Sequence, residues 1–258
     1  MNWIHAIIFG TVEGITEFLP ISSTGHLILT AKLLGLSQTE AMKSFEIAIQ
    51  LGAILAVLWM YWRSFFCEWE IVKRVAAAFF PTALIGFLLY HWIKKFLFSN
   101  PLTVLWALGI GGTVLIFFDL LYREKDGAVR EIARVSFPQA LGIGVCQSLA
   151  VIPGVSRSAA TILGAIGLGI ERKKAVEFSF LLAVPTILAA TLLDLFKNRS
   201  AFEQSDWGML FVGGFVSFVV AAISIRFFLG FIQKTKRGLL FFGVYRILLT
   251  VIFWIFVK

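Results

Sequence analysis

Two polar stretches interrupt an otherwise apolar chain of 258 residues. Residues 13–26 contain two glutamates, several hydroxyl side chains, a proline and a histidine. Residues 147–161 contain a proline–glycine pair, serines, a threonine and an arginine. Carboxylate, hydroxyl, imidazole and guanidinium groups together can bind and cleave a phosphate compound. We interpret the two stretches as parts of one phosphate site inside a membrane.

The first stretch supplies carboxylates and a nucleophile. Glu13 and Glu17 are one helical turn apart, so both carboxylates point to the same side, where they can hold a divalent cation or orient a base. Ser22 and Ser23 stand at the expected start of a helix, where free backbone N–H groups attract an anion. His26 follows one turn later as a base for Ser23, or as the nucleophile itself, and a water remains the third alternative. The competing interpretation is a polar helix face at the membrane interface.

The second stretch supplies a cation. The planar fork of Arg157 matches phosphate oxygens, although a purely structural pairing with a glutamate would explain it too. The other candidate phosphate-binding residues of this stretch are Gly154, Ser156, Ser158 and Thr161. Four polar side chains elsewhere are expected either to support the site or to satisfy helix ends: Glu46, Gln50, Glu177 and Ser179. We expect Arg226 and Arg246 to extend toward the membrane surface.

The composition is that of an integral membrane protein, because 59% of the residues are hydrophobic and only 15% are charged. Crossing the hydrocarbon core takes about 20 apolar helical residues. Six stretches qualify: 44–62, 75–93, 101–122, 178–196, 208–232 and 239–257. The net charge of +8 comes largely from short loops, so we expect membrane lipid and phosphate as partners and no nucleic acid. The two cysteines are predicted to be free thiols.

An internal repeat organises the chain. A shift of 134 residues aligns Glu13 with Gln147 and Ser23 with Arg157. The fold class is therefore predicted to be an all-α polytopic membrane protein, a single membrane domain over residues 1–258. It should have six transmembrane helices and two re-entrant helical hairpins, near residues 3–36 and 136–170. Because three spans follow each hairpin, the repeats, about 1–125 and about 135–258, should have inverted topology, which would bring Ser23 close to Arg157.

The distribution of basic residues predicts the orientation. The loops 63–74, 123–134, 171–177 and 233–238 carry 13 Lys and Arg residues, and the opposite side carries seven. The positive-inside rule then places these four loops in the cytoplasm and both termini outside.

The polar motifs also resemble a known family. Residues 13–26 (EGITEFLPISSTGH) and 153–158 (PGVSRS) look like the bacterial undecaprenyl-diphosphate phosphatases, also called bacitracin-resistance proteins, and so do residues 50–57 and 177–185. The resemblance covers essentially the whole chain. It implies hydrolysis of undecaprenyl diphosphate, a polyprenyl diphosphate lipid, to the monophosphate and inorganic phosphate. It also implies a divalent cation (Mg²⁺ or Ca²⁺) and resistance to bacitracin, an antibiotic that sequesters the substrate. The resemblance further implies a place in cell-wall synthesis, at the outer face of the inner membrane.

The family's functional positions fall here on residues of the expected types: Glu13, Glu17, Ser22, Ser23, His26, Ser156, Arg157 and Thr161. The alternative function is a secondary transporter or lipid flippase, because inverted repeats with broken helices are typical of transporters. The combined glutamate, serine, histidine and arginine set favours the phosphatase, since binding alone does not require it. The nucleophile, the metal and a homodimeric state stay open.

Overall fold

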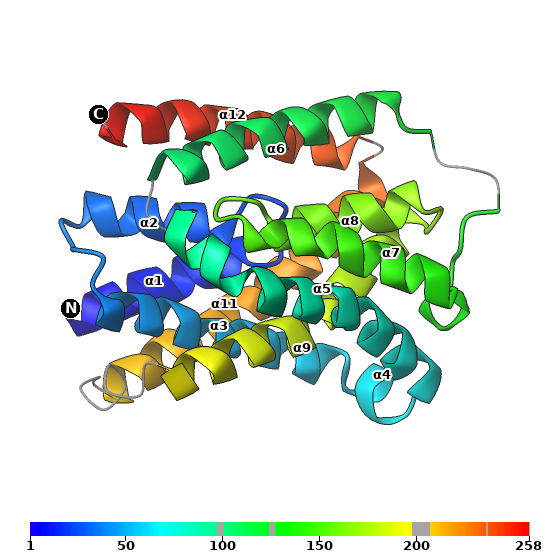
Figure 1. Cartoon of the computed structure of the whole chain (residues 1–258), viewed down its shortest axis with the longest axis horizontal. Helices are drawn as coiled ribbons and strands as arrows, with labels where there is room; N and C mark the ends of the chain where they lie inside the picture. The colour runs from blue at the N-terminus through cyan, green and yellow to red at the C-terminus, as the bar shows by residue number, and fades with distance from the viewer. Residues whose placement is uncertain (97–100, 124–126, 198–206, 236, 258) are drawn as a thin grey trace.

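The computed structural model describes residues 1–96, 101–123, 127–197, 207–235 and 237–257, and within these ranges the regular structure is helical (Figure 1). A single isolated bridge joins Val129 to Ile170. The α-helices are α1 (Trp3–Thr16), α2 (Ser23–Leu33), α3 (Glu40–Met60), α4 (Trp62–Phe66), α5 (Trp69–Phe96), α6 (Pro101–Leu121), α7 (Phe137–Ser148), α8 (Arg157–Gly167), α9 (Arg172–Lys197), α11 (Trp207–Lys234) and α12 (Gly238–Val257). Short 3₁₀ turns cover Ile132–Arg134 and Leu149–Val151.

Six helices are long and apolar enough to cross a membrane, namely α3, α5, α6, α9, α11 and α12. They coincide with the six predicted spans, and the chain is a multi-pass membrane protein. The starts of two helices differ most from the predicted spans: α5 starts at Trp69 and α9 at Arg172, each six residues earlier than predicted (75 − 69 and 178 − 172). Hydropathy does not include these first turns because they carry charged side chains. Outside the hydrocarbon layer their backbone still forms helical hydrogen bonds.

Two pairs of short helices surround the polar stretches. The pair α1 and α2 opens toward the end of the molecule that carries both termini, whereas α7 and α8 open toward the opposite end (Figure 1). The tips of the two pairs touch, because the Ser158 hydroxyl donates a 2.7 Å hydrogen bond to the Phe18 carbonyl. Re-entry of these pairs into a membrane and the repeat relationship remain predictions.

Glycine contacts set the position of α1, and thereby of Glu13. A Cβ atom on Gly10 would lie 2.4 Å from the carbonyl oxygen of Gly213, and one on Gly14 would lie 2.7 Å from that of Ser217. Such spacing is closer than any side chain permits, so α1 lies directly against the backbone of α11.

The basic loops share one end of the molecule. In Figure 1, α4, the α8–α9 connection, the start of α7 and the turn into α12 lie opposite the termini. This agrees with the predicted grouping of the loops, whereas the membrane face that they occupy remains a prediction. Four of the counted basic residues lie outside the described residues: Lys125, Arg199, Lys236 and Lys258.

Candidate active site

Glu17 joins the two polar stretches. Its Oε2 accepts a 2.6 Å hydrogen bond from the Ser23 hydroxyl, and its Oε1 accepts one of 2.8 Å from Nη2 of Arg157. The Arg157 and Glu17 side chains are only 11% and 7% exposed. The end of α1 and the starts of α2 and α8 thus bring these groups together. The predicted proximity of Ser23 and Arg157 is confirmed, with Glu17 as the bridge.

Arg157 is held firmly but retains an unused donor. Its Nη1 donates to the Ser179 carbonyl at 2.9 Å, and its guanidinium lies 5.7 Å from the centre of the Phe18 ring. Its buried Nε has no hydrogen-bond partner among the described residues. A buried N–H without a partner is costly, so this donor is suited to a ligand oxygen.

Glu13 is fully buried, and neither carboxylate oxygen has a hydrogen-bond partner in the described part of the chain. Burial raises the pKa of Glu13 well above its ordinary value, and the neighbouring Glu17 carboxylate adds to this, as does Glu46 more weakly, while Arg157 opposes them. An ionised Glu13 therefore needs a cation beside it.

The start of α2 is strained. Ser22 has φ 71° and ψ 94° and is the one non-glycine residue with positive φ in the described ranges. It occupies the expected N-cap position, yet its side chain makes no capping hydrogen bond. The first N–H groups of α2 are therefore left without this side-chain acceptor, as an anion site requires. Strain of this kind is characteristic of functional sites.

His26 does not contact Ser23 as predicted. Its Nδ1 lies 2.8 Å from the Ser22 carbonyl oxygen, and its Nε2 lies 2.7 Å from the hydroxyl of Tyr245. The imidazole and phenol rings are nearly parallel, with centroids 5.6 Å apart. Burial lowers the pKa of His26, and Arg246 lowers it further, while the Ser22 contact opposes the shift. The predicted Ser23–His26 pair is wrong for this structure. The Ser23 hydroxyl donates its hydrogen bond to Glu17, and the His26 ring contacts the Tyr245 hydroxyl on α12.

The remaining hydroxyls of the second stretch mostly bind protein atoms. The Ser156 hydroxyl caps α8 by accepting from the Ala159 N–H at 3.1 Å, which leaves its own O–H free to donate. Thr161 donates to the Arg157 carbonyl at 2.9 Å and also contacts the Ser179 hydroxyl. Together with Ser158, which joins the two tips, Thr161 fixes the site rather than facing an open space.

Sequence reasoning missed Arg246, which is 1% exposed and does not extend to the surface. Its guanidinium donates to four carbonyl oxygens, those of Ala107 (2.8 Å), Gly154 (3.1 Å), Leu108 (3.2 Å) and Pro20 (3.5 Å). Gly154, expected to serve phosphate, instead binds Arg246 through its carbonyl and has φ +91°. A lone arginine in an apolar run ordinarily extends to the interface, which is why the sequence analysis expected this of Arg246. That expectation is wrong, since the side chain is buried.

A weak signal was the glycine-rich face of α6. A Cβ on Gly111 would lie 2.4 Å from Nη2 of Arg246, so this glycine provides room for the guanidinium. Arg226 is exposed, and its guanidinium lies 5.8 Å from the centre of the Trp59 ring. Its extension to the membrane surface stays a prediction.

The expected supporting residues divide into two groups. Ser179 belongs to the site through Arg157 and Thr161. Glu46 accepts from Gln38 at 3.1 Å, and Glu177 accepts from Lys174 at 2.7 Å near the start of α9. Gln50 is half-buried on α3. The structure thus ties Glu177 to a helix end and leaves Gln50 without an assigned role.

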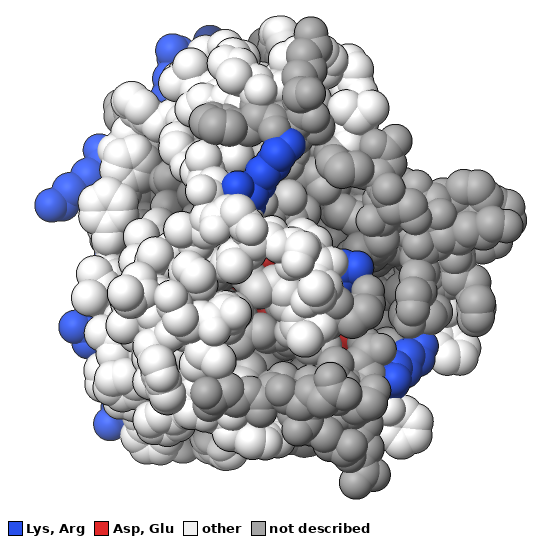
Figure 2. Space-filling view, turned by 90° about the vertical axis from the view of Figure 1, so that its left-hand side faces the viewer, with Lys and Arg blue, Asp and Glu red and all other residues white. Residues whose placement is uncertain are grey.

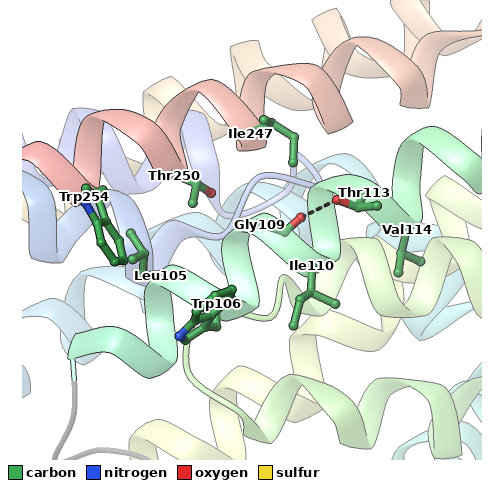
Figure 3. Close-up of a pocket in the computed structure, with 9 residues that line it drawn as sticks. All are labelled: Leu105, Trp106, Gly109, Ile110, Thr113, Val114, Ile247, Thr250 and Trp254. Carbon is green, nitrogen blue, oxygen red and sulfur yellow. Dashed lines mark hydrogen bonds between the residues drawn. The ribbon is translucent and has the colours of Figure 1, made fainter.

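The surface has a groove that is separate from the candidate site. Figure 2 views the end that carries the termini, where acidic atoms are visible only in recesses near the centre and basic side chains lie around them. A groove of about 370 Å³ lies between α6 and α12 (Figure 3). It is lined mainly by apolar side chains, including Trp106, Ile110 and Trp254, and by none of the candidate site residues.

Six apolar spans and a buried cluster of carboxylate, hydroxyl, imidazole and guanidinium groups define a multi-pass membrane protein with a polar site inside it. Residues 6–252 match the model of the family described as bacitracin resistance protein BacA, and the chain belongs to this family. It is 50% identical to an undecaprenyl-diphosphatase of Aquifex aeolicus, with 96% of each chain covered. It is 48% identical to an undecaprenyl-diphosphatase of a Sulfurihydrogenibium species (99% of each chain) and 47% identical to that of Campylobacter fetus (100% of each). These relatives do not favour the transporter alternative.

Proposed function

We propose that the protein is a membrane phosphatase that hydrolyses undecaprenyl diphosphate to undecaprenyl phosphate and inorganic phosphate. The similar proteins carry the name of this activity. The observation that carries the proposal is the chain Ser23–Glu17–Arg157, in which a hydroxyl, a carboxylate and a guanidinium from opposite halves of the sequence meet in a buried site. A binding site alone would not require a hydroxyl aimed at a carboxylate.

In the first step, the Ser23 oxygen bonds to the terminal phosphorus, its proton passes to Glu17, and the bridging P–O bond breaks to release undecaprenyl phosphate. The free N–H groups at the start of α2 and the unused donor of Arg157 stabilise the phosphate oxygens. Water then attacks the phosphoserine and frees inorganic phosphate. Direct attack by His26 is less favoured because both of its nitrogens already have partners.

Glu13 and Glu17 are proposed to hold a divalent cation, Mg²⁺ or Ca²⁺. Two carboxylates with phosphate oxygens and water form an ordinary site for such a hard ion, and the unpartnered oxygens of Glu13 fit this role. No group of three His, Cys, Asp or Glu side chains suitable for a metal is found among the described residues. We propose that phosphate oxygens of the substrate complete the site. When bound, the cation would neutralise charge on the phosphate.

We infer that the protein lies in the bacterial inner membrane with both termini outside, and that its site opens to the outer face. The distribution of basic residues supports this orientation, because the basic loops lie at the end opposite the termini (Figure 1). There the enzyme would recycle the lipid carrier of cell-wall synthesis. It would also confer bacitracin resistance by consuming the diphosphate lipid that the antibiotic sequesters.

Phosphate release from undecaprenyl diphosphate by the purified protein in detergent tests the proposal. Arg157→Gln should abolish release, whereas Arg226→Gln, which changes an exposed arginine stacked on Trp59, should retain it. If the unaltered protein, with Mg²⁺ or Ca²⁺ supplied, releases no phosphate from this lipid, the proposed function is wrong.

A further inference from the structure

Two buried polar side chains without partners lie on neighbouring helices. Neither carboxylate oxygen of Glu13 on α1 accepts a hydrogen bond, and the Ser217 hydroxyl on α11 has no partner among the residues that the structure describes. Both residues are 0% exposed. A buried carboxylate or hydroxyl that stays unpaired is costly, so each of these groups is suited to a ligand that the protein itself does not provide.

Backbone contacts place the two residues at the same depth. A Cβ atom on Gly14, the residue after Glu13, would lie 2.7 Å from the Ser217 carbonyl oxygen. One turn earlier on both helices, a Cβ atom on Gly10 would lie 2.4 Å from the Gly213 carbonyl oxygen. The helices α1 and α11 therefore run side by side in register, with Glu13 beside the turn of α11 that ends at Ser217.

The same two residues face a third helix, α3. Phe9, one turn before Glu13, packs edge-on against Phe45 of α3, with ring centroids 6.4 Å apart. A Cβ atom on Gly213, one turn before Ser217, would lie 2.9 Å from the same Phe45 ring. Because residues four apart lie on one face of a helix, Glu13 and Ser217 both face the seam where α1, α3 and α11 meet.

This seam is a polar layer between two apolar clusters. Phe9 on α1 and Leu210 on α11 pack in one cluster. Phe18 and Ala221, further along the same helices, pack in the other. The two unpartnered residues lie between these clusters on their own helices. Ionisable groups at such a depth are expensive and usually serve a function.

We propose that the Ser217 hydroxyl is an oxygen ligand of the divalent cation that Glu13 and Glu17 are proposed to hold. This inference rests on the proposed function. Both Glu17 oxygens already accept hydrogen bonds, so Glu13 and Ser217 have the unused ligand capacity in this layer. Hard cations such as Mg²⁺ and Ca²⁺ bind oxygen, and a serine hydroxyl beside phosphate oxygens is an ordinary Mg²⁺ ligand. A neutral hydroxyl adds a ligand without adding negative charge beside the two carboxylates.

Binding of Mn²⁺ to the purified protein in detergent tests this ligand without any activity. Mn²⁺ prefers the same oxygen ligands as Mg²⁺, and electron paramagnetic resonance measures the free ion. Inorganic phosphate is added because phosphate oxygens are proposed to complete the site. Removing a group that supports a metal site costs roughly tenfold or more in affinity, so Ser217→Ala should raise the Kd for Mn²⁺ by about this factor. The matched variant Ser224→Ala, which changes a buried serine two turns further along α11, should keep the Kd of the unaltered protein.

Thermal unfolding separates a cation ligand from a structural residue. Without a divalent cation, Ser217→Ala should unfold at the same temperature as the unaltered protein or a higher one, because it removes a buried hydroxyl that has no partner. With Mn²⁺ and phosphate, the rise in unfolding temperature should be smaller in Ser217→Ala, since stabilisation by a ligand depends on its concentration relative to Kd. Ser224→Ala should show the full rise.

Three results would overturn the ligand role of Ser217. They are an unaltered protein that binds no Mn²⁺, an unchanged Kd in Ser217→Ala, and a loss of stability in Ser217→Ala that is equal with and without the cation. Absence of phosphate release from undecaprenyl diphosphate by the unaltered protein instead refutes the proposed function, and the Mn²⁺ titration then still decides the role of Ser217.

Discussion

Replacing Arg157 by lysine separates geometry from charge. The arginine makes two hydrogen bonds in different directions, to Glu17 at 2.8 Å and to the Ser179 carbonyl at 2.9 Å, and it has a third buried donor at Nε. A lysine ammonium can remain near Glu17 but cannot also present a planar pair of donors to phosphate. Losing one donor that acts in the transition state costs about 10²–10³ in rate. We therefore expect kcat to fall by at least a hundredfold in Arg157→Lys.

Stability should change much less than activity. The lysine variant keeps a cation beside Glu17 and loses mainly the bond to the Ser179 carbonyl, which is worth about 1–3 kcal/mol if that acceptor stays unsatisfied. The assay pairs phosphate release under saturating substrate with thermal unfolding in the same detergent. Near-normal turnover by Arg157→Lys would refute the fork argument. A large loss of folded protein that parallels the loss of rate would instead show a structural role.

Three more predictions address the nucleophile, the arginine on α12 and the cation. Rapid acid quenching should trap an acid-stable phosphoprotein that is absent in Ser23→Ala; an acid-labile adduct that persists in this variant would exclude the serine. Gly111→Ala should lower the free energy of unfolding by about 1–3 kcal/mol, because the new Cβ would lie 2.4 Å from Arg246, whereas Gly86→Ala, with nothing within 4 Å, should not. Chelation should stop phosphate release until Mg²⁺ or Ca²⁺ is restored, and Glu13→Gln should raise the cation concentration for half-activity by about tenfold or more; activity that is indifferent to chelators would contradict the cation site.

The membrane class and the six spans could be predicted from the sequence because a helix of about 20 apolar residues matches the thickness of the hydrocarbon core. It also predicted that Ser23 and Arg157 meet, since their repeat positions correspond. Both predictions depend on patterns that extend over many residues. A wrong assignment of one or two residues does not change a prediction that depends on such a pattern.

The partners of individual side chains were harder to predict. Spacing alone placed His26 near Ser23, but the strained backbone at Ser22 and the competing Tyr245 hydroxyl, which lies 219 residues away along the chain, determine where the ring points. Likewise, the sequence predicts that Arg246 lies at the interface, whereas in the structure it donates to four carbonyl oxygens from distant segments. Contacts between segments so far apart in sequence leave no periodic signal.

The helix α12 follows both polar tips in the chain, and this order bears on how the protein is made. Both Tyr245 and Arg246 belong to this helix, and Arg246 contacts the carbonyls of Pro20 and Gly154 in the two tips. During synthesis both polar tips are therefore made before this arginine, and they lack its hydrogen bonds until α12 is inserted. Chains that stop before residue 238 would lack these contacts, however well their earlier helices insert, and would leave unsatisfied carbonyl oxygens for cellular quality control to detect.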